Sequence, residues 1–327
     1  SRFTVQQLSG LDTTFLNIET PTTYGHICGL TIFDPTADTA IPSTYEDLKR
    51  VLAERLHLVP PFRRRLVEVP LGLDQPYWIE DPHFDLDFHV RHIGLPAPGN
   101  KQQLAQQVER IIARPLDRSR PLWELYLIEG LENGHIAQLS KFHHSAIDGV
   151  SGAELLAATL DIEPTPRRVD PPERPWEPDR EPTELEMLNR GLIALSQRPL
   201  KDLRLFMETI NSLPELMRAT GVEFPQLGRR RSAVLDGDEP LLSEASTKPP
   251  RVSFNSLISP HRRFAFVSLP FDDIKTVKNA FGVTVNDVVL ALSAGALRRY
   301  LEVHDELPDD PLIAMVPISV RTDDESG

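Results

Sequence analysis

Two adjacent histidines, His143 and His144, are the residues of this 327-residue chain best suited to chemistry. They lie where a strand-like segment, 136–142, meets a helix that Ser151 and Glu154 are predicted to cap. An imidazole with an unperturbed pKa of about 6.5 can accept a proton from a hydroxyl near neutral pH. Because neighbouring side chains of a strand point to opposite faces, only one histidine can readily face a shared cavity. We therefore predict one general base, His144, and no metal site.

Asp148 and Gly149 follow the histidines within the same turn. The carboxylate of Asp148 could either orient the imidazole or pair with a buried arginine and hold the shape of the turn. Spacing does not choose between these roles. Gly149 permits tight backbone geometry, and free N–H groups at the next helix start favour a developing negative charge. On residue types alone, catalysis is only slightly favoured over a structural histidine pair.

The elements around the turn predict a mixed α/β domain over residues 1–160. Apolar residues at helical spacing indicate amphipathic helices at 48–58 and 102–112. Aromatic and β-branched runs at 77–79 and 88–90 are typical of short strands.

The composition changes after this domain. Residues 161–260 hold fourteen of the thirty prolines and are predicted to form a crossover linker with one helical island, 183–219. Residues 261–327 indicate the start of a second α/β domain, with a strand at 264–269, a helix at 283–301 and a strand at 312–320. Thr284 and Asp287 match a capping box, so that helix should begin close to Asn286. So small a unit cannot close a core alone, and we expect its remainder to be absent from this chain.

Charge and cysteine content limit the classes of function. The net charge of −13 argues against general affinity for nucleic acid or anionic lipid. The single cysteine, Cys28, cannot close a disulfide within the chain, which favours a reducing compartment. No apolar run reaches the roughly 18 residues of a membrane span, and the N-terminus lacks the apolar core of a secretory signal. These observations predict a cytoplasmic protein.

A resemblance to a known family indicates a more specific function. The string HHSAIDG at 143–149 matches the HHxxxDG motif of the CoA-dependent acyltransferase superfamily, which includes condensation domains and chloramphenicol acetyltransferase-like enzymes. Further stretches resemble the bacterial wax ester synthase/diacylglycerol acyltransferase family. They are the signature LSGLDTTFL at 8–16, the PLW motif at 120–124, the Asn-Asp helix motif at 284–291, and the segments 81–98 and 316–321.

The resemblance implies two chloramphenicol acetyltransferase-like units, each a mixed sheet flanked by helices, with a substrate tunnel between them. It also implies that His144 takes the proton of an alcohol as that oxygen attacks an acyl-CoA thioester, without an acyl-enzyme. Asn286 would donate to the oxyanion, and Asp287 belongs to the same helix motif. The apolar PLW residues are expected to line the acyl channel or to pack in the core, with equal weight; they are Pro121, Leu122 and Trp123.

The expected reaction transfers a long-chain acyl group from acyl-CoA to diacylglycerol, giving triacylglycerol, with fatty alcohol as a second acceptor. Acyl-CoA is a co-substrate, and no cofactor is expected. Because both substrates are lipids, we expect peripheral contact with the inner membrane face or lipid droplets. The phosphates of CoA could meet arginines 63–65 or 229–231, although such runs are more often ion-paired or solvated.

Three other interpretations compete with this one. Another HHxxxDG acyltransferase or condensation-type enzyme would share the motif. A serine hydrolase would use Ser151, since the string at 149–153 follows a strand and precedes a helix, but its fifth residue is Ala153 rather than glycine. A carrier-protein or lipid-binding module would keep the fold without turnover.

Overall fold

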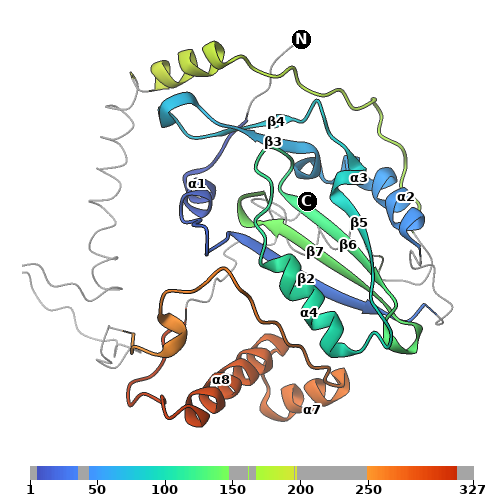
Figure 1. The fold of residues 1–327 in the computed structure, drawn as a ribbon, viewed down its shortest axis with the longest axis vertical. Helices are drawn as coiled ribbons and strands as arrows, with labels where there is room; N and C mark the ends of the chain where they lie inside the picture. The colour runs from blue at the N-terminus through green and yellow to red at the C-terminus, as the bar shows by residue number, and fades with distance from the viewer. Residues whose placement is uncertain are drawn as a thin grey trace, which may run out of the picture. The chain divides into compact units, whose positions relative to one another are not determined.

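The computed structural model describes residues 6–35, 44–146, 161, 167–194, 196 and 249–314 (Figure 1). The chain divides into two compact units. The first is Ser1–Pro199 with Ile258–Val267, and the second is Leu200–Leu257 with Ser268–Gly327.

The first unit is built on a four-stranded mixed sheet with strand order β2-β7-β6-β5. The strands are β2 (His26–Phe33), β5 (Val90–Gly94), β6 (Trp123–Glu129) and β7 (Ile136–His143). β5 pairs with β6 in parallel, and the other neighbours are antiparallel. Every residue of β7 is buried, because the strand pairs on both edges and its side chains pack into apolar clusters on both faces of the sheet. The predicted strand before the two histidines is therefore confirmed.

Helices cover both faces of this sheet, as the mixed α/β prediction requires. On one face, α4 (Lys101–Ile112) buries Leu104 and Val108 against Leu139 of β7. On the other face, α2 (Tyr45–Arg55) buries Leu48 and Leu52 in a cluster that includes Phe142 of β7. Alternate residues of β7 supply the two clusters because successive strand side chains point to opposite faces. Both predicted helices are confirmed, with small shifts at their ends.

A second, smaller sheet packs beside the first helix of the chain. It is antiparallel in the order β1-β4-β3, formed by β1 (Gln6–Gln7), β3 (Arg64–Val67) and β4 (Tyr77–Glu80). Helix α1 (Gly10–Asn17) follows β1, and the Ser9 side chain caps it by accepting from the Asp12 N–H. Short 3₁₀ turns connect the elements at Leu56–Leu58, Pro60–Arg63, Pro70–Gly72, Glu132–Gly134, His144–Ala146 and Ser253–Asn255.

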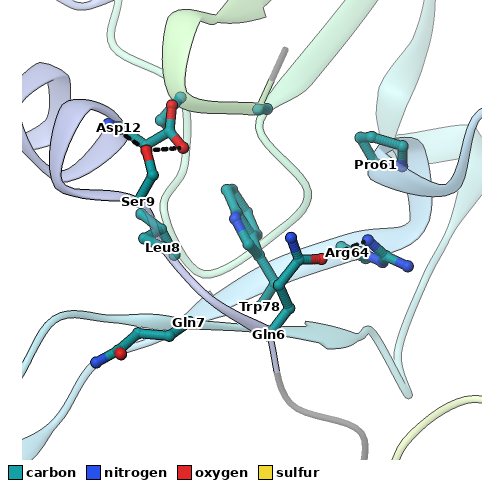
Figure 2. A pocket seen from close by; sticks show the side chains of 10 residues that line it. Gln6, Gln7, Leu8, Ser9, Asp12, Pro61, Arg64 and Trp78 are labelled. Carbon is teal, nitrogen blue, oxygen red and sulfur yellow. Dashed lines mark hydrogen bonds between the residues drawn. The ribbon is translucent and has the colours of Figure 1, made fainter. Parts of the chain in front are cut away.

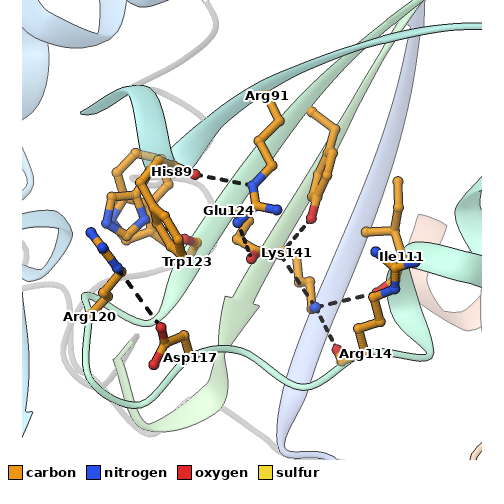
Figure 3. Close-up of polar contacts among 11 residues, drawn as sticks. His89, Arg91, Ile111, Arg114, Asp117, Arg120, Trp123, Glu124 and Lys141 are labelled. Carbon is orange, nitrogen blue, oxygen red and sulfur yellow. Dashed lines mark hydrogen bonds and ion pairs between the residues drawn. The ribbon is translucent and has the colours of Figure 1, made fainter. Parts of the chain in front are cut away.

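A buried polar network joins α4 to the main sheet (Figure 3). Lys141 of β7 donates to the carbonyls of Ile111 and Arg114 at the end of α4, and its Nζ lies 3.5 Å from Glu124 Oε2. Tyr126 donates to the same Glu124 oxygen. Burial lowers the pKa of Lys141, but the carboxylate and the helix C-terminal carbonyls provide its partners. The network holds β7 in place behind the histidine turn.

Two strand predictions are wrong. Residues 88–90 were expected to be a strand, but Phe88 and His89 belong to α3 (Leu86–His89), because Asp85 caps a helical turn by accepting from the Asp87 N–H, and only Val90 is in a strand, as the first residue of β5. The segment 264–269 forms no strand; instead Phe264 packs against the α4 face, and its N–H donates to Glu109. The expected strand at 312–320 is not formed at 311–314, and its remainder lies outside the described residues.

Part of the proline-rich segment belongs to the first unit. The Trp176 indole donates to Glu80, and the Glu80 N–H donates to Asp179. A helix begins after Thr183, whose hydroxyl accepts from the Glu186 N–H, and it covers 184–194. The rest of the predicted helical island lies outside the described residues, except residue 196.

The second unit contains α7 (Phe271–Phe281) and α8 (Val285–Val303). The predicted helix at 283–301 and its Thr284 cap are confirmed. Gly282 ends α7 in the left-handed conformation, with φ +64°, where an L side chain would be strained. In the described part of the chain no single helix has the length and hydropathy to span a membrane; α7 and α8 pass that test only as a pair, bent by 102°.

Candidate active site

The two histidines lie at the end of β7 and point into different surroundings. His143 is the last residue of β7 and is 1% exposed. His144 starts the 3₁₀ turn His144–Ala146 and is exposed. Of these two imidazoles only that of His144 is exposed, and the change from strand to 3₁₀ turn between the two residues separates their surroundings.

His143 is surrounded by polar partners. Its Nδ1 lies 2.7 Å from Ser145 Oγ and accepts from the Ser145 backbone N–H at 3.1 Å. Its Nε2 lies 3.2 Å from Glu19 Oε1. The backbone N–H of His143 donates to the Leu122 carbonyl. The contacts of His143 therefore help to hold the turn His144–Ala146 in place.

Two contacts fix the position of His144, one through its backbone N–H and one through the face of its imidazole ring. Its N–H donates to the Gly25 carbonyl at 2.8 Å. Its ring stacks on Phe15 of α1 with the centroids 4.0 Å apart and the planes 15° apart. Within the described residues neither ring nitrogen of His144 has a hydrogen-bond partner. The imidazole is therefore positioned while its nitrogens stay available.

Sequence reasoning missed three residues that contact the pair: Phe15, Glu19 and Gly25. Phe15 falls within the stretch LSGLDTTFL, which pointed to a family but gave no role to this ring. Glu19 and Gly25 lie in no singled-out motif, and nothing in their local sequence marks them. A Cβ on Gly25 would lie 2.7 Å from His143 Nε2, so the close approach of the segment before β2 to the end of β7 requires glycine at this position.

The Glu19 carboxylate has a strongly perturbed pKa. Burial raises the pKa of this group, but the contact with His143 and the hydrogen bonds from the Gly25 N–H and Arg118 together outweigh burial and lower the pKa to about 2 from 4.5. Folding is therefore favoured by the ionised form of Glu19.

This shift predicts a pH dependence of stability. A folded-state pKa below the unfolded value contributes stability that is complete above the unfolded pKa of 4.5 and is lost as pH falls through about 2. The free energy of unfolding lost in Glu19→Gln should therefore be constant above about pH 5 and shrink below it. Urea unfolding at several pH values measures this difference, with Glu129→Gln, at the exposed Glu129–His92 pair, as matched control. A difference that stays constant down to pH 3 would contradict the prediction.

A pocket opens beside the histidine turn (Figure 2). Its volume is about 170 Å³, and Ser145 and Ala146 of the turn form part of its wall. Polar groups come from Asp12 of α1 and Arg64 of β3, and an apolar wall from Trp78 of β4. The remaining lining residues are Gln6, Gln7, Leu8, Ser9 and Pro61.

The PLW residues lie in the core. Leu122 is 0% exposed and packs with Leu8 and Leu16, while Trp123 is 1% exposed and packs with Phe62. This burial favours the packing alternative over the channel-wall alternative. The same residues position the turn, since Leu122 accepts from the His143 N–H.

Asn286 and Asp287 lie at the start of α8 in the second unit. The Asp287 carboxylate accepts from the N–H and the hydroxyl of Thr284 at 2.8 and 2.7 Å, and the hydrogen bonds from Thr284 lower its pKa. Its observed role is to cap the helix. Asn286 is exposed, and its donation to an oxyanion stays a prediction. Three further candidates, Asp148, Gly149 and Ser151, lie outside the described residues.

The first arginine cluster is largely engaged with protein partners. Arg64 donates to Glu80 at 2.8 Å, and Arg65 contacts both Asp81 and Glu181. The guanidinium of Arg63 lies over the Trp176 ring, 5.1 Å from its centroid. These contacts favour a structural role over phosphate binding. Residues 229–231 lie outside the described part of the chain.

Comparison with known proteins assigns the chain to a family. The model of the wax ester synthase/diacylglycerol acyltransferase catalytic domain matches residues 8–289. Two proteins of Mycobacterium tuberculosis, both named as candidate diacylglycerol O-acyltransferases, are 35% identical over 97% of this chain; the matches cover 63% and 59% of their lengths. The wax ester synthase/diacylglycerol acyltransferase from Marinobacter aquaeolei VT8 matches with a TM-score of 0.61 and 31% identity, over 96% of this chain and 65% of that one.

This chain belongs to the wax ester synthase/diacylglycerol acyltransferase family. It spans about 63% of the length of the first of these relatives. The predicted family and fold class are confirmed, with a mixed sheet flanked by helices in the first unit.

Proposed function

We propose that this chain provides the histidine-bearing part of an O-acyltransferase, which moves a long-chain acyl group from acyl-CoA to the hydroxyl of diacylglycerol. The observation that carries the proposal is the contrast between the two histidines. His144 is exposed, with its ring stacked on Phe15, while His143 is buried in contact with Glu19 and Ser145. Family membership supports the reaction class.

In the proposed reaction, His144 acts as general base on the acceptor hydroxyl. Its unprotonated nitrogen takes the hydroxyl proton as the oxygen bonds to the thioester carbonyl carbon. The tetrahedral intermediate then expels the CoA thiolate, which takes the proton from the imidazolium and leaves as the thiol. The products are the ester and free CoA, no acyl-enzyme is formed, and the residues need no cofactor.

The pocket beside the turn is walled in part by Ser145 and Ala146, the two residues after His144, although His144 itself does not line it. We propose diacylglycerol as the main acceptor and fatty alcohol as the second. The test supplies radiolabelled long-chain acyl-CoA with each acceptor and measures the labelled ester. Triacylglycerol should form faster than wax ester, and labelled free fatty acid without ester would point to a hydrolase instead.

We also propose that the protein contacts a membrane or lipid droplet peripherally, because its substrates are lipids. Exposed apolar side chains of α7 and α8 support this, among them Phe271, Phe281 and Val289. Flotation with phosphatidylcholine liposomes containing diacylglycerol should carry the protein upward. Protein that stays at the bottom of the gradient would contradict the proposal.

A further inference from the structure

The carboxylate of Glu19 lies between His143 and Arg118. Its Oε1 is 3.2 Å from His143 Nε2 and accepts from the Gly25 N–H at 2.7 Å. Its Oε2 accepts from Arg118 at 2.6 and 3.2 Å. Both carboxylate oxygens are therefore occupied, and the side chain is 13% exposed. A group held from two sides in this way has little freedom to turn.

The hydrogen bond to Nδ1, on the side of the His143 ring away from Glu19, shows which ring nitrogen carries the proton. A backbone N–H can only donate, so the Ser145 N–H at 3.1 Å requires a lone pair on Nδ1. In the neutral ring the proton must then lie on Nε2, which faces Glu19. The Nε2–Oε1 contact at 3.2 Å does not have the geometry of a hydrogen bond, so the Glu19 charge acts on the Nε2 side of the ring electrostatically. That attraction and the Ser145 N–H favour the same tautomer.

The segment that carries Glu19 also contacts the second histidine. Phe15 stacks on the His144 ring, and the Gly25 carbonyl accepts from the His144 N–H. Gly25 in turn donates its own N–H to Glu19. A displacement of Glu19 would therefore reach His144 by two routes, through the His143–Ser145 turn and through the Gly25 backbone.

We propose that Glu19 is a positioning residue of the active site: its contacts with His143 and Gly25 hold the turn that presents the His144 imidazole to substrate. The inference rests on the proposed function, because it assigns the reacting base to His144. The contacts of Glu19 with His143 and Gly25 are with residues that support the turn, so its proposed action on His144 is indirect.

The test replaces Glu19 with glutamine in the full chain. Glutamine keeps the size of the side chain but has one acceptor oxygen, so it loses the hydrogen bond from either the Gly25 N–H or Arg118. It also loses the negative charge that lies 3.2 Å from His143 Nε2. We expect kcat per folded molecule to fall about 10- to 100-fold, as when an orienting partner is removed, with the KM for acyl-CoA changed less than about twofold. Glu129→Gln alters an exposed Glu–His pair on the same sheet and should leave kcat unchanged.

Nitrogen-15 NMR of the His143 imidazole in the full chain provides a readout that does not depend on activity. In the wild type the proton should lie on Nε2, and in Glu19→Gln the ring signals should shift toward a mixture of tautomers. A kcat per folded molecule within twofold of the wild type, or unchanged His143 signals, would overturn the inference. If the wild type transfers no acyl group, the proposed function fails, and the NMR comparison alone decides whether Glu19 positions His143.

Discussion

Replacing His144 with alanine is expected to lower kcat for acyl transfer by about 10²- to 10⁴-fold, the usual contribution of a general base. The loss follows from the proposed role of this imidazole, whose nitrogens have no hydrogen-bond partner within the described residues. Because His144 is exposed, the substitution should change the free energy of unfolding little. The measurement is ester formation from radiolabelled acyl-CoA and diacylglycerol at saturating substrate.

Two further variants separate base catalysis from packing. His144→Phe keeps an aromatic ring that can stack on Phe15 but has no nitrogen, so it should lose as much activity as the alanine variant. His92→Ala removes an exposed histidine of β5 and should keep full activity. Wild-type turnover in His144→Phe would show that the ring serves only as a packing surface.

Replacing Trp123 with alanine is expected to destabilise the first unit by about 3 to 5 kcal/mol, the range for a large buried aromatic residue. Its ring stacks on Phe62 and on His89, each with centroids 4.5 Å apart, and the indole N–H donates to the Phe62 carbonyl at 2.8 Å. Truncation would remove these contacts and leave a cavity in the cluster that supports β6 and β7.

Urea unfolding followed by tryptophan fluorescence measures this loss. The other two tryptophans, Trp78 and Trp176, belong to the same unit and report on its unfolding. Trp123→Phe keeps an apolar ring but loses the donated hydrogen bond, so it should cost less than alanine. Leu71→Ala, at a side chain 87% exposed, should stay within about 0.5 kcal/mol. A loss below 1 kcal/mol in Trp123→Ala would mean that the PLW tryptophan does not hold the core.

Several local features of this protein could be read directly from its sequence. The period of apolar residues predicted α2, α4 and α8, and the Thr284–Asp287 capping box gave the start of α8. His143 and His144 do face different surroundings, as predicted, although His144 lies in the 3₁₀ turn after β7, where strand alternation no longer sets the direction of its side chain. The helix predictions succeed because a side chain's direction within one helix depends on the backbone repeat alone.

Local signals failed where a short run had more than one favourable conformation. Residues 88–90 carry strand-forming residues, yet Asp85 caps a helical turn there, and the buried His89 stacks on Trp123. Phe264 and Phe266 have the alternation of a strand, but their side chains pack onto the α4 cluster without strand pairing. Tertiary contacts overrode local propensity in both places.

The sequence by itself indicated the family and the position of the histidine pair at the end of a strand, and it predicted His144 rather than His143 as the base. Only the tertiary structure brought Phe15, Glu19 and Gly25 to that pair. These residues come from α1 and from the segment between α1 and β2, which reaches the end of β7 through the pairing of His26 with His143. Such contacts depend on which strands become neighbours, and no local pattern of residue types encodes that pairing across more than a hundred residues of chain.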